Sequence, residues 1–308
     1  MPKLNVQQNN QNVIQAFKNA LAIGNLKGII ASDGSHNFST AGSNRNLLDN
    51  PWWGSGEVVN QRGVTAKPSN NQYGIDRWIV ASGADANTMA FGTSGITFTI
   101  SASSIWNTQR TKNPSAWSGK TLTASVLLSD GTIKSGTAAF TLGTNTVFYT
   151  DNALTLSLNT SGYFVVAVKA SQTIRAVKLE LGSTSTLAND APPAYEKALN
   201  DCQYRCVVYE SMPANFLFCH GVATTTTNLR AVIDLPRSMA KDTVPTVTIT
   251  GNLTTPQGNT ITAMASASTV SRGNKLVVNC TTTGLTGGNT YDVSTGNGGQ
   301  TITISADL

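Results

Sequence analysis

The feature that most constrains the fold of this chain is a period of two in its apolar residues, which begins near residue 46 and recurs up to the C-terminal residues. In "GITFTISAS", apolar and polar side chains alternate from Ile96 to Ile100. Because successive side chains of a strand point to opposite faces, this alternation is typical of strands that bury one face. "KTLTASVLLSDGTIKSGTAAFTL" contains two such runs around Ser129-Asp130-Gly131, which predicts a β-hairpin. We therefore expect a mainly β protein.

The length of 308 residues predicts more than one folded unit, because domains commonly hold roughly 100–200 residues. Turn-rich segments divide the β runs into two groups. We expect an N-terminal helix over 1–24, a linker over 25–45, a jelly-roll-like β-sandwich over 46–185, a linker with a short helix over 186–212, and a second β-sandwich over 213–308.

The composition indicates sheets whose outer faces carry hydroxyl and amide groups. Charged residues make up 12% of the chain, about half of the roughly 25% that is usual, while 40% of the residues are hydrophobic. The net charge of +5 could suggest nucleic acid, but the 21 basic residues are scattered singly, so we expect no nucleic-acid binding. The sequence contains no run of about 18 apolar residues, so we expect no membrane insertion. The segment "MPKLNVQQNNQNVIQ" lacks the apolar region of a secretion signal.

The N-terminal segment carries one apolar helical stripe, in which Val13, Phe17 and Leu21 recur at four-residue spacing. A short helix with one such stripe is marginal alone in water. It could pack on its own domain, but we expect Val13, Phe17 and Leu21 to serve oligomerisation or anchoring to a larger assembly.

The four cysteines are Cys202, Cys206, Cys219 and Cys280, and we expect them to be buried free thiols. Cys202 and Cys206 fall on one stripe of a helix predicted in "AYEKALNDCQYRCVVYE". A zinc site of these residues with Cys219 and His220 is conceivable, but neighbours on a strand point to opposite faces. We expect no metal and no cofactor.

Two adjacent tryptophans, Trp52 and Trp53, stand in the turn-rich stretch "NLLDNPWWGSGEVVNQRG". If this stretch is extended, one indole should face the core and the other a subunit contact or a ligand. Sugar rings stack on indoles, and Asn60, Gln61 and Arg62 lie close in sequence to bind hydroxyl groups. Structural packing is the competing interpretation.

Two further segments are candidates for recognition. Trp106 lies beside a polar loop and is the more exposed candidate among the remaining tryptophans, whereas Trp78 and Trp117 are expected to pack. The Gly-rich segment "GLTGGNTYDVSTGNGGQ" is interpreted as tip loops, on which Asn289, Tyr291 and Asp292 could meet a ligand. Tight β-turns alone would also explain its glycines.

Several fragments in order resemble phage tail-fibre and related virion-fibre proteins. They are "NLLDN", "VNQRG", "YGIDRW", "AVKLELGSTST", a Cys-Gln near a helix end, "NLRAVIDLPRSMAKDTVPTVTITGN" and the terminal "ITISADL". The chain departs from that pattern at "CQYRCVVYE", with an added cysteine, and at "PWW", where the family often has a single aromatic residue. The resemblance spans roughly residues 44–308.

The resemblance implies a homotrimeric virion protein that pairs a carbohydrate-binding-like sandwich with a distal β tip. Its implied partners are sister copies, other virion proteins through the N-terminal segment, and host cell-surface glycan. It would assemble in the host cytoplasm and act on the released virion. The absence of paired acids or a catalytic motif in the sequence favours a non-enzymatic protein. A purely structural head fibre or capsid decoration, and a polysaccharide depolymerase, are the alternatives.

Overall fold

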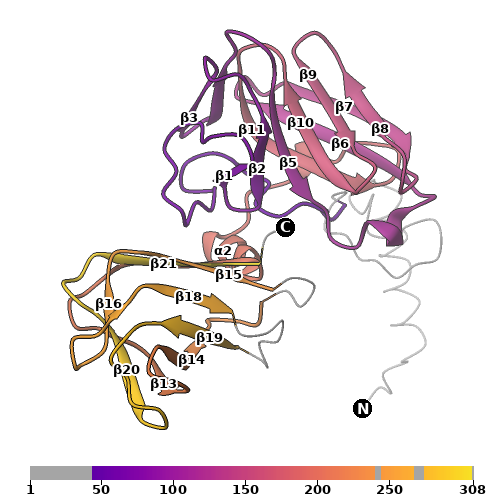
Figure 1. Ribbon diagram of the computed structural model, residues 1–308. Helices are drawn as coiled ribbons and strands as arrows, with labels where there is room; N and C mark the ends of the chain where they lie inside the picture. Colours follow the sequence, from indigo (N-terminus) through magenta and orange to yellow (C-terminus); the bar gives the residue numbers. More distant parts are fainter. Residues whose placement is uncertain (1–43, 240–243, 267–273, 307–308) are drawn as a thin grey trace, which may run out of the picture.

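The computed structural model describes residues 44–239, 244–266 and 274–306, and these residues form a mainly β protein. Figure 1 shows a β-sandwich at the top and a C-terminal β unit below it, with the single described α-helix between them. Within these residues, no helix is long and apolar enough to cross a membrane. The predicted N-terminal helix with Val13, Phe17 and Leu21 lies outside the described residues, as does nearly all of the predicted linker over 25–45.

The β-sandwich is of jelly-roll type and consists of two antiparallel sheets. The six-stranded sheet has the order β1 (Gln72–Ile75), β2 (Trp78–Ser82), β5 (Ile105–Arg110), β10 (Tyr163–Val168), β9 (Leu154–Leu158), β8 (Thr146–Thr150). The five-stranded sheet has the order β3 (Thr88–Gly92), β4 (Gly95–Thr99), β11 (Gln172–Leu181), β6 (Thr121–Leu128), β7 (Ile133–Ala139). Alternate side chains of both sheets fill one buried core, which includes Trp53, Trp78, Phe98, Phe164 and Leu179.

The hairpin predicted around residues 129–131 is confirmed. Strands β6 and β7 pair antiparallel, and Gly131 has the positive φ of 87° that the turn requires. The Asp130 carboxylate accepts a hydrogen bond of 2.8 Å from the Thr132 amide. This side-chain contact closes the turn locally, which is why a short sequence motif sufficed to predict it.

Helix α2 (Tyr195–Gln203) confirms the predicted short helix, but it ends before Cys206. Cys206 instead begins strand β12 (Cys206–Met212), which pairs with β21 (Gln300–Ser305) of the C-terminal unit. The prediction of Cys202 and Cys206 on one helical face is therefore wrong. The β-branched run that follows Cys206 favours a strand, and pairing with a remote partner decides the outcome.

The C-terminal unit contains a three-stranded and a seven-stranded antiparallel sheet around a second apolar core. The smaller sheet has the order β12, β21, β15 (Thr246–Thr250). The larger sheet has the order β17 (Thr260–Ile261), β16 (Leu253–Thr254), β20 (Thr290–Thr295), β13 (Leu217–Ala223), β14 (Asn228–Asp234), β19 (Lys275–Thr281), β18 (Ala263–Ser266).

All four cysteines are buried thiols that form no disulfide with one another. Burial raises the pKa of the Cys219 thiol, and it raises that of Cys280 to about 12. Cys219 lies in the second core, whereas its neighbour His220 lies on the opposite, exposed face of β13. The two side chains therefore point to opposite faces of the strand, which confirms the prediction that they do not converge. No group of three metal-binding side chains occurs among residues 44–239, 244–266 and 274–306.

Candidate functional site

The two adjacent tryptophans point to opposite faces of the sandwich sheet, but both are buried. Trp53 packs edge-on against Trp78 in the main core, with ring centroids 5.0 Å apart. The main chain of Trp52 forms an isolated bridge with Ala176. The Trp52 side chain packs with Leu187 in a small cluster that is separate from the main core. The expectation that one indole faces a subunit contact or a ligand is wrong, because the segment around Leu187 covers Trp52 and buries it.

That covering segment is fixed by a buried polar network on β11. Lys178 and Glu180 are fully buried, and the Lys178 Nζ lies 2.8 Å from the Asp190 carboxylate and 2.7 Å from the Thr186 hydroxyl. Glu180 accepts the Thr186 amide and hydroxyl. Since each buried charge has partners of opposite charge or hydrogen-bonding groups, the network holds the chain over Trp52.

The polar residues predicted to serve Trp52 and Trp53 stabilise the protein instead. Asn60 forms two hydrogen bonds with the main chain of Val64 and closes its own loop. Gln61 donates to the buried Asp76 carboxylate at 2.7 Å and to the carbonyl oxygen of Cys206 at 3.0 Å. Gln61 thus connects the sandwich to the C-terminal unit.

Arg62 continues this connection. Its Nη1 lies 2.9 Å from the Asp76 carboxylate, its Nη2 contacts the Ser305 hydroxyl at 3.4 Å, and its guanidinium stacks 4.2 Å from the Tyr73 ring. Asn60, Gln61 and Arg62 therefore do not surround a ligand pocket with the tryptophans.

The predicted tip loop is partly a strand. Thr290–Thr295 forms β20 inside the seven-stranded sheet, and Tyr291 is buried with its hydroxyl accepting the Thr286 amide. Asp292 points outward and pairs with His220 at 2.6 Å, while Asn289 is exposed in the preceding turn. The interpretation of Thr290–Thr295 as a loop is wrong, because its alternation buries Tyr291 and Val293 in the second core.

Among the predicted tryptophan candidates, Trp106 is the one that the structure leaves accessible. On β5, Ile105, Asn107 and Gln109 are buried, whereas Trp106 points to the outer face of the six-stranded sheet and is 46% exposed. Its indole N–H donates to the Ser104 hydroxyl at 2.8 Å. This hydrogen bond restrains the ring and leaves its apolar face available.

Trp106 borders a groove of about 730 Å³ on that outer face, a volume in the range of roughly 300–1,000 Å³ typical of ligand sites. Strand pairing builds its floor: Trp106 lies opposite Ala167 on β10, and Ala167 lies opposite Thr155 on β9. The groove is lined by Asn71, Ile79, Ala81, Ser82, Ser104, Trp106, Thr108, Asn145, Val147, Thr155, Ser157, Asn159, Tyr163, Val165, Ala167 and Lys169.

The chemistry of the groove combines apolar contact area with neutral hydrogen-bonding groups. Val147 is 53% exposed on β8 and faces the groove, as Trp106 does on β5. Hydroxyl and amide side chains lie between and around these apolar surfaces. Lys169 is the only charged residue among the described residues that line the groove, so two facing carboxylates for glycosidic cleavage are absent there.

A second network steadies the β8 end of the same sheet. Lys169 donates to the Thr150 hydroxyl and to the Asp151 carbonyl oxygen, each at 3.0 Å. Burial acts to raise the pKa of the Asp151 carboxyl, but hydrogen bonds from Lys134, Tyr149 and two backbone amides outweigh it. They hold this pKa well below the usual range.

Alternation on each strand could have identified which groove residues share a face. It could not show that the face is hollow and uncovered, because that depends on the lateral order of the six strands. Val147, Thr155, Ser157, Tyr163 and Val165 were missed for this reason.

No protein-family model, curated protein or solved structure matches this chain.

Proposed function

We propose that this chain is a non-enzymatic attachment protein of a phage particle, and that the groove beside Trp106 binds a sugar unit of a host surface glycan. One observation carries the proposal: an indole restrained by Ser104 stands 46% exposed at a groove lined with hydroxyl and amide groups. The apolar C–H face of a sugar ring stacks on such an indole, and its hydroxyl groups need neutral partners.

The virion setting rests on the ordered sequence fragments that resemble tail-fibre proteins. A homotrimer, and attachment to other virion proteins through the N-terminal segment with Val13, Phe17 and Leu21, belong to the same proposal. Binding without cleavage is favoured over a depolymerase at this groove, since its described lining supplies no carboxylate.

The contribution of Trp106 to binding follows from its accessible area. If an indole offers about 250 Å² in all, a 46% exposed ring presents roughly 115 Å². A sugar covers about half of this, and at about 25 cal/mol per Å² the stack stabilises the complex by roughly 1.4 kcal/mol. Loss of the ring should therefore weaken binding about tenfold.

The test is a glycan array of host surface sugars, probed with the wild-type protein and with Trp106→Ala, and followed by titration of each sugar that binds. Phe216→Ala is the matched control, because Phe216 is also 46% exposed but lies in the C-terminal unit outside the groove. We expect Trp106→Ala to bind about tenfold more weakly and Phe216→Ala to bind as the wild type does. Thermal melts should confirm that both variants fold. A wild-type protein that binds no glycan, or equal loss in both variants, would refute the site and favour a purely structural role.

A further inference from the structure

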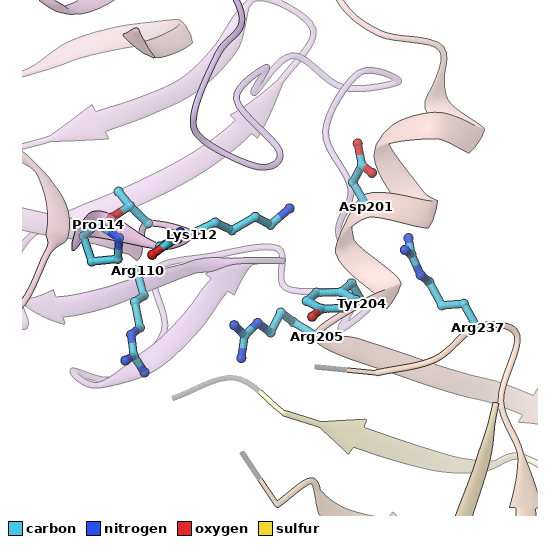
Figure 2. Close-up of a pocket in the computed structure, with 9 residues that line it drawn as sticks. Arg110, Lys112, Pro114, Asp201, Tyr204, Arg205 and Arg237 are labelled. Atoms are coloured by element: carbon cyan, nitrogen blue, oxygen red, sulfur yellow. The ribbon is translucent and has the colours of Figure 1, made fainter. Parts of the chain in front are cut away.

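A second hollow lies between the sandwich and the C-terminal unit, and none of the site residues predicted from the sequence lines it. This cleft has a volume of about 560 Å³ and lies where the end of β5, the loop after it, the C-terminal end of α2 and the segment after β14 meet (Figure 2). Its charged lining residues are Arg110, Lys112, Asp201, Arg205 and Arg237. Four basic groups thus face one carboxylate.

The carboxylate does not balance these cations. Asp201 lies 2.9 Å from Lys197, its neighbour one turn earlier on α2. The partner of Lys112 is Asp49, at 2.7 Å, but Asp49 also holds Arg77 at 3.2 Å. The cleft therefore retains an excess of positive charge.

Three of the cations gather around one aromatic ring. The charged groups of Lys112, Arg205 and Arg237 lie 6.0, 5.6 and 5.5 Å from the ring centroid of Tyr204 (Figure 2). The Tyr204 hydroxyl has no hydrogen-bond partner among the described residues. Cations held this close repel one another, and the ring only partly offsets the repulsion.

Arg110 supplies a donor that the described residues leave unused. Its guanidinium forms no hydrogen bond or ion pair with the described part of the chain, although its carbonyl oxygen accepts from Arg77. By contrast, Arg237 donates to the Asn200 carbonyl oxygen, and Arg205 donates to the Ala306 carbonyl oxygen at 3.2 Å. These two contacts hold the cations in place.

We propose that this cleft binds a phosphate group, with Arg110 and the Tyr204 hydroxyl as direct donors and Lys112, Arg205 and Arg237 supplying the positive field. A guanidinium fork matches two oxygens of a tetrahedral oxyanion, and charge-assisted hydrogen bonds are about twice as strong as neutral ones. A phosphate dianion also suits the charge excess better than a carboxylate does. Because the cleft is built from both units, the bound anion connects them.

The probe is inorganic phosphate, titrated into the full chain by calorimetry at constant ionic strength set with sodium chloride. We expect saturable binding that weakens about tenfold in Arg110→Gln and measurably in Tyr204→Phe, which removes only the hydroxyl. Arg230→Gln is the matched control, since this substitution makes the same charge change at an exposed position of β14 outside the cleft. It should bind phosphate as the wild type does.

Two further measurements distinguish free phosphate from a phosphate ester and test this cleft independently of the glycan groove. Glycerol phosphate that binds more tightly than inorganic phosphate would assign the cleft to a phosphate ester, whereas the reverse order would assign it to the free ion. Trp106→Ala should leave phosphate binding unchanged, so failure of the glycan site does not affect this result. No saturable binding by the wild type, or equal weakening in Arg230→Gln, would overturn the inference.

Discussion

Replacing Asn50 by alanine should strongly destabilise the sandwich, because this one residue supports both tryptophans of the core. Asn50 is 3% exposed, and its carbonyl oxygen accepts the indole N–H of Trp53 at 3.2 Å and of Trp78 at 3.0 Å. Its side-chain amide donates to the carbonyl oxygens of Val59 and Asp76 at 2.8 and 2.9 Å and accepts the Val59 amide at 2.9 Å.

The magnitude follows from these contacts. Asn50→Ala removes three buried side-chain hydrogen bonds. The Val59 amide and the Asp76 carbonyl oxygen lose this partner, whereas the Val59 carbonyl oxygen still accepts the Asp76 amide. At about 1 kcal/mol for each bond, and more for each orphaned group, the loss is roughly 3–5 kcal/mol. Alanine in the left-handed conformation of Asn50, where φ is 47°, adds only about 1 kcal/mol.

Asn71→Ala isolates the backbone cost, because Asn71 also has a positive φ, of 63°, and is exposed in the same sandwich. Urea unfolding followed by tryptophan fluorescence should give a free energy of unfolding at least about 2 kcal/mol lower for Asn50→Ala than for Asn71→Ala. Equal stability of the two variants would refute the reasoning that the side-chain hydrogen bonds of Asn50 hold in place the segment whose carbonyl oxygen accepts both indoles.

Three other outcomes are expected. Asp151→Asn should make the free energy of unfolding depend less on pH between pH 2 and 6 than it does in the wild type. The pKa of this carboxyl is lowered in the folded protein, so its charge stabilises the fold above the unfolded pKa near 4, and this contribution is lost as the pH falls. Lys178→Met should cost about 3–5 kcal/mol in urea unfolding by leaving buried carboxylates without their cation, and an unchanged midpoint would contradict this role. Since burial raises the pKa of Cys219 and Cys280, a thiol reagent at pH 8 should modify them only after denaturation, and rapid reaction in the native protein would show that they are accessible.

Local patterns predicted the elements whose structure is decided locally. Apolar alternation predicted most strands, and the Ser129-Asp130-Gly131 turn predicted the β6–β7 hairpin because the Asp130 side chain closes it. The end of α2 was less predictable. Cys206 continues the helical stripe of Cys202, and only its pairing with the distant Ser305 places it in a strand.

The candidate sites were less predictable because accessibility is set by remote segments. Trp52 would be exposed without the turn around Leu187, and the buried Lys178 that fixes this turn resembles a surface residue in the sequence. Trp106 shows the opposite outcome: it stands in an alternating strand, and no other described segment covers its side of the sheet.

A side chain that already uses its donors within the protein is a poor candidate for ligand recognition, and this distinguishes the predicted residues from those proposed here. Gln61 and Arg62 use theirs on Asp76, Cys206 and Ser305, and so hold the two units together. The ring face of Trp106 and the guanidinium of Arg110 have no such role within the described part of the chain. A single stacked ring contributes only about a factor of ten in affinity, so attachment through this groove requires several copies on one particle. Linked sites then raise the overall affinity without any new contact. The proposed trimer would supply such linked sites.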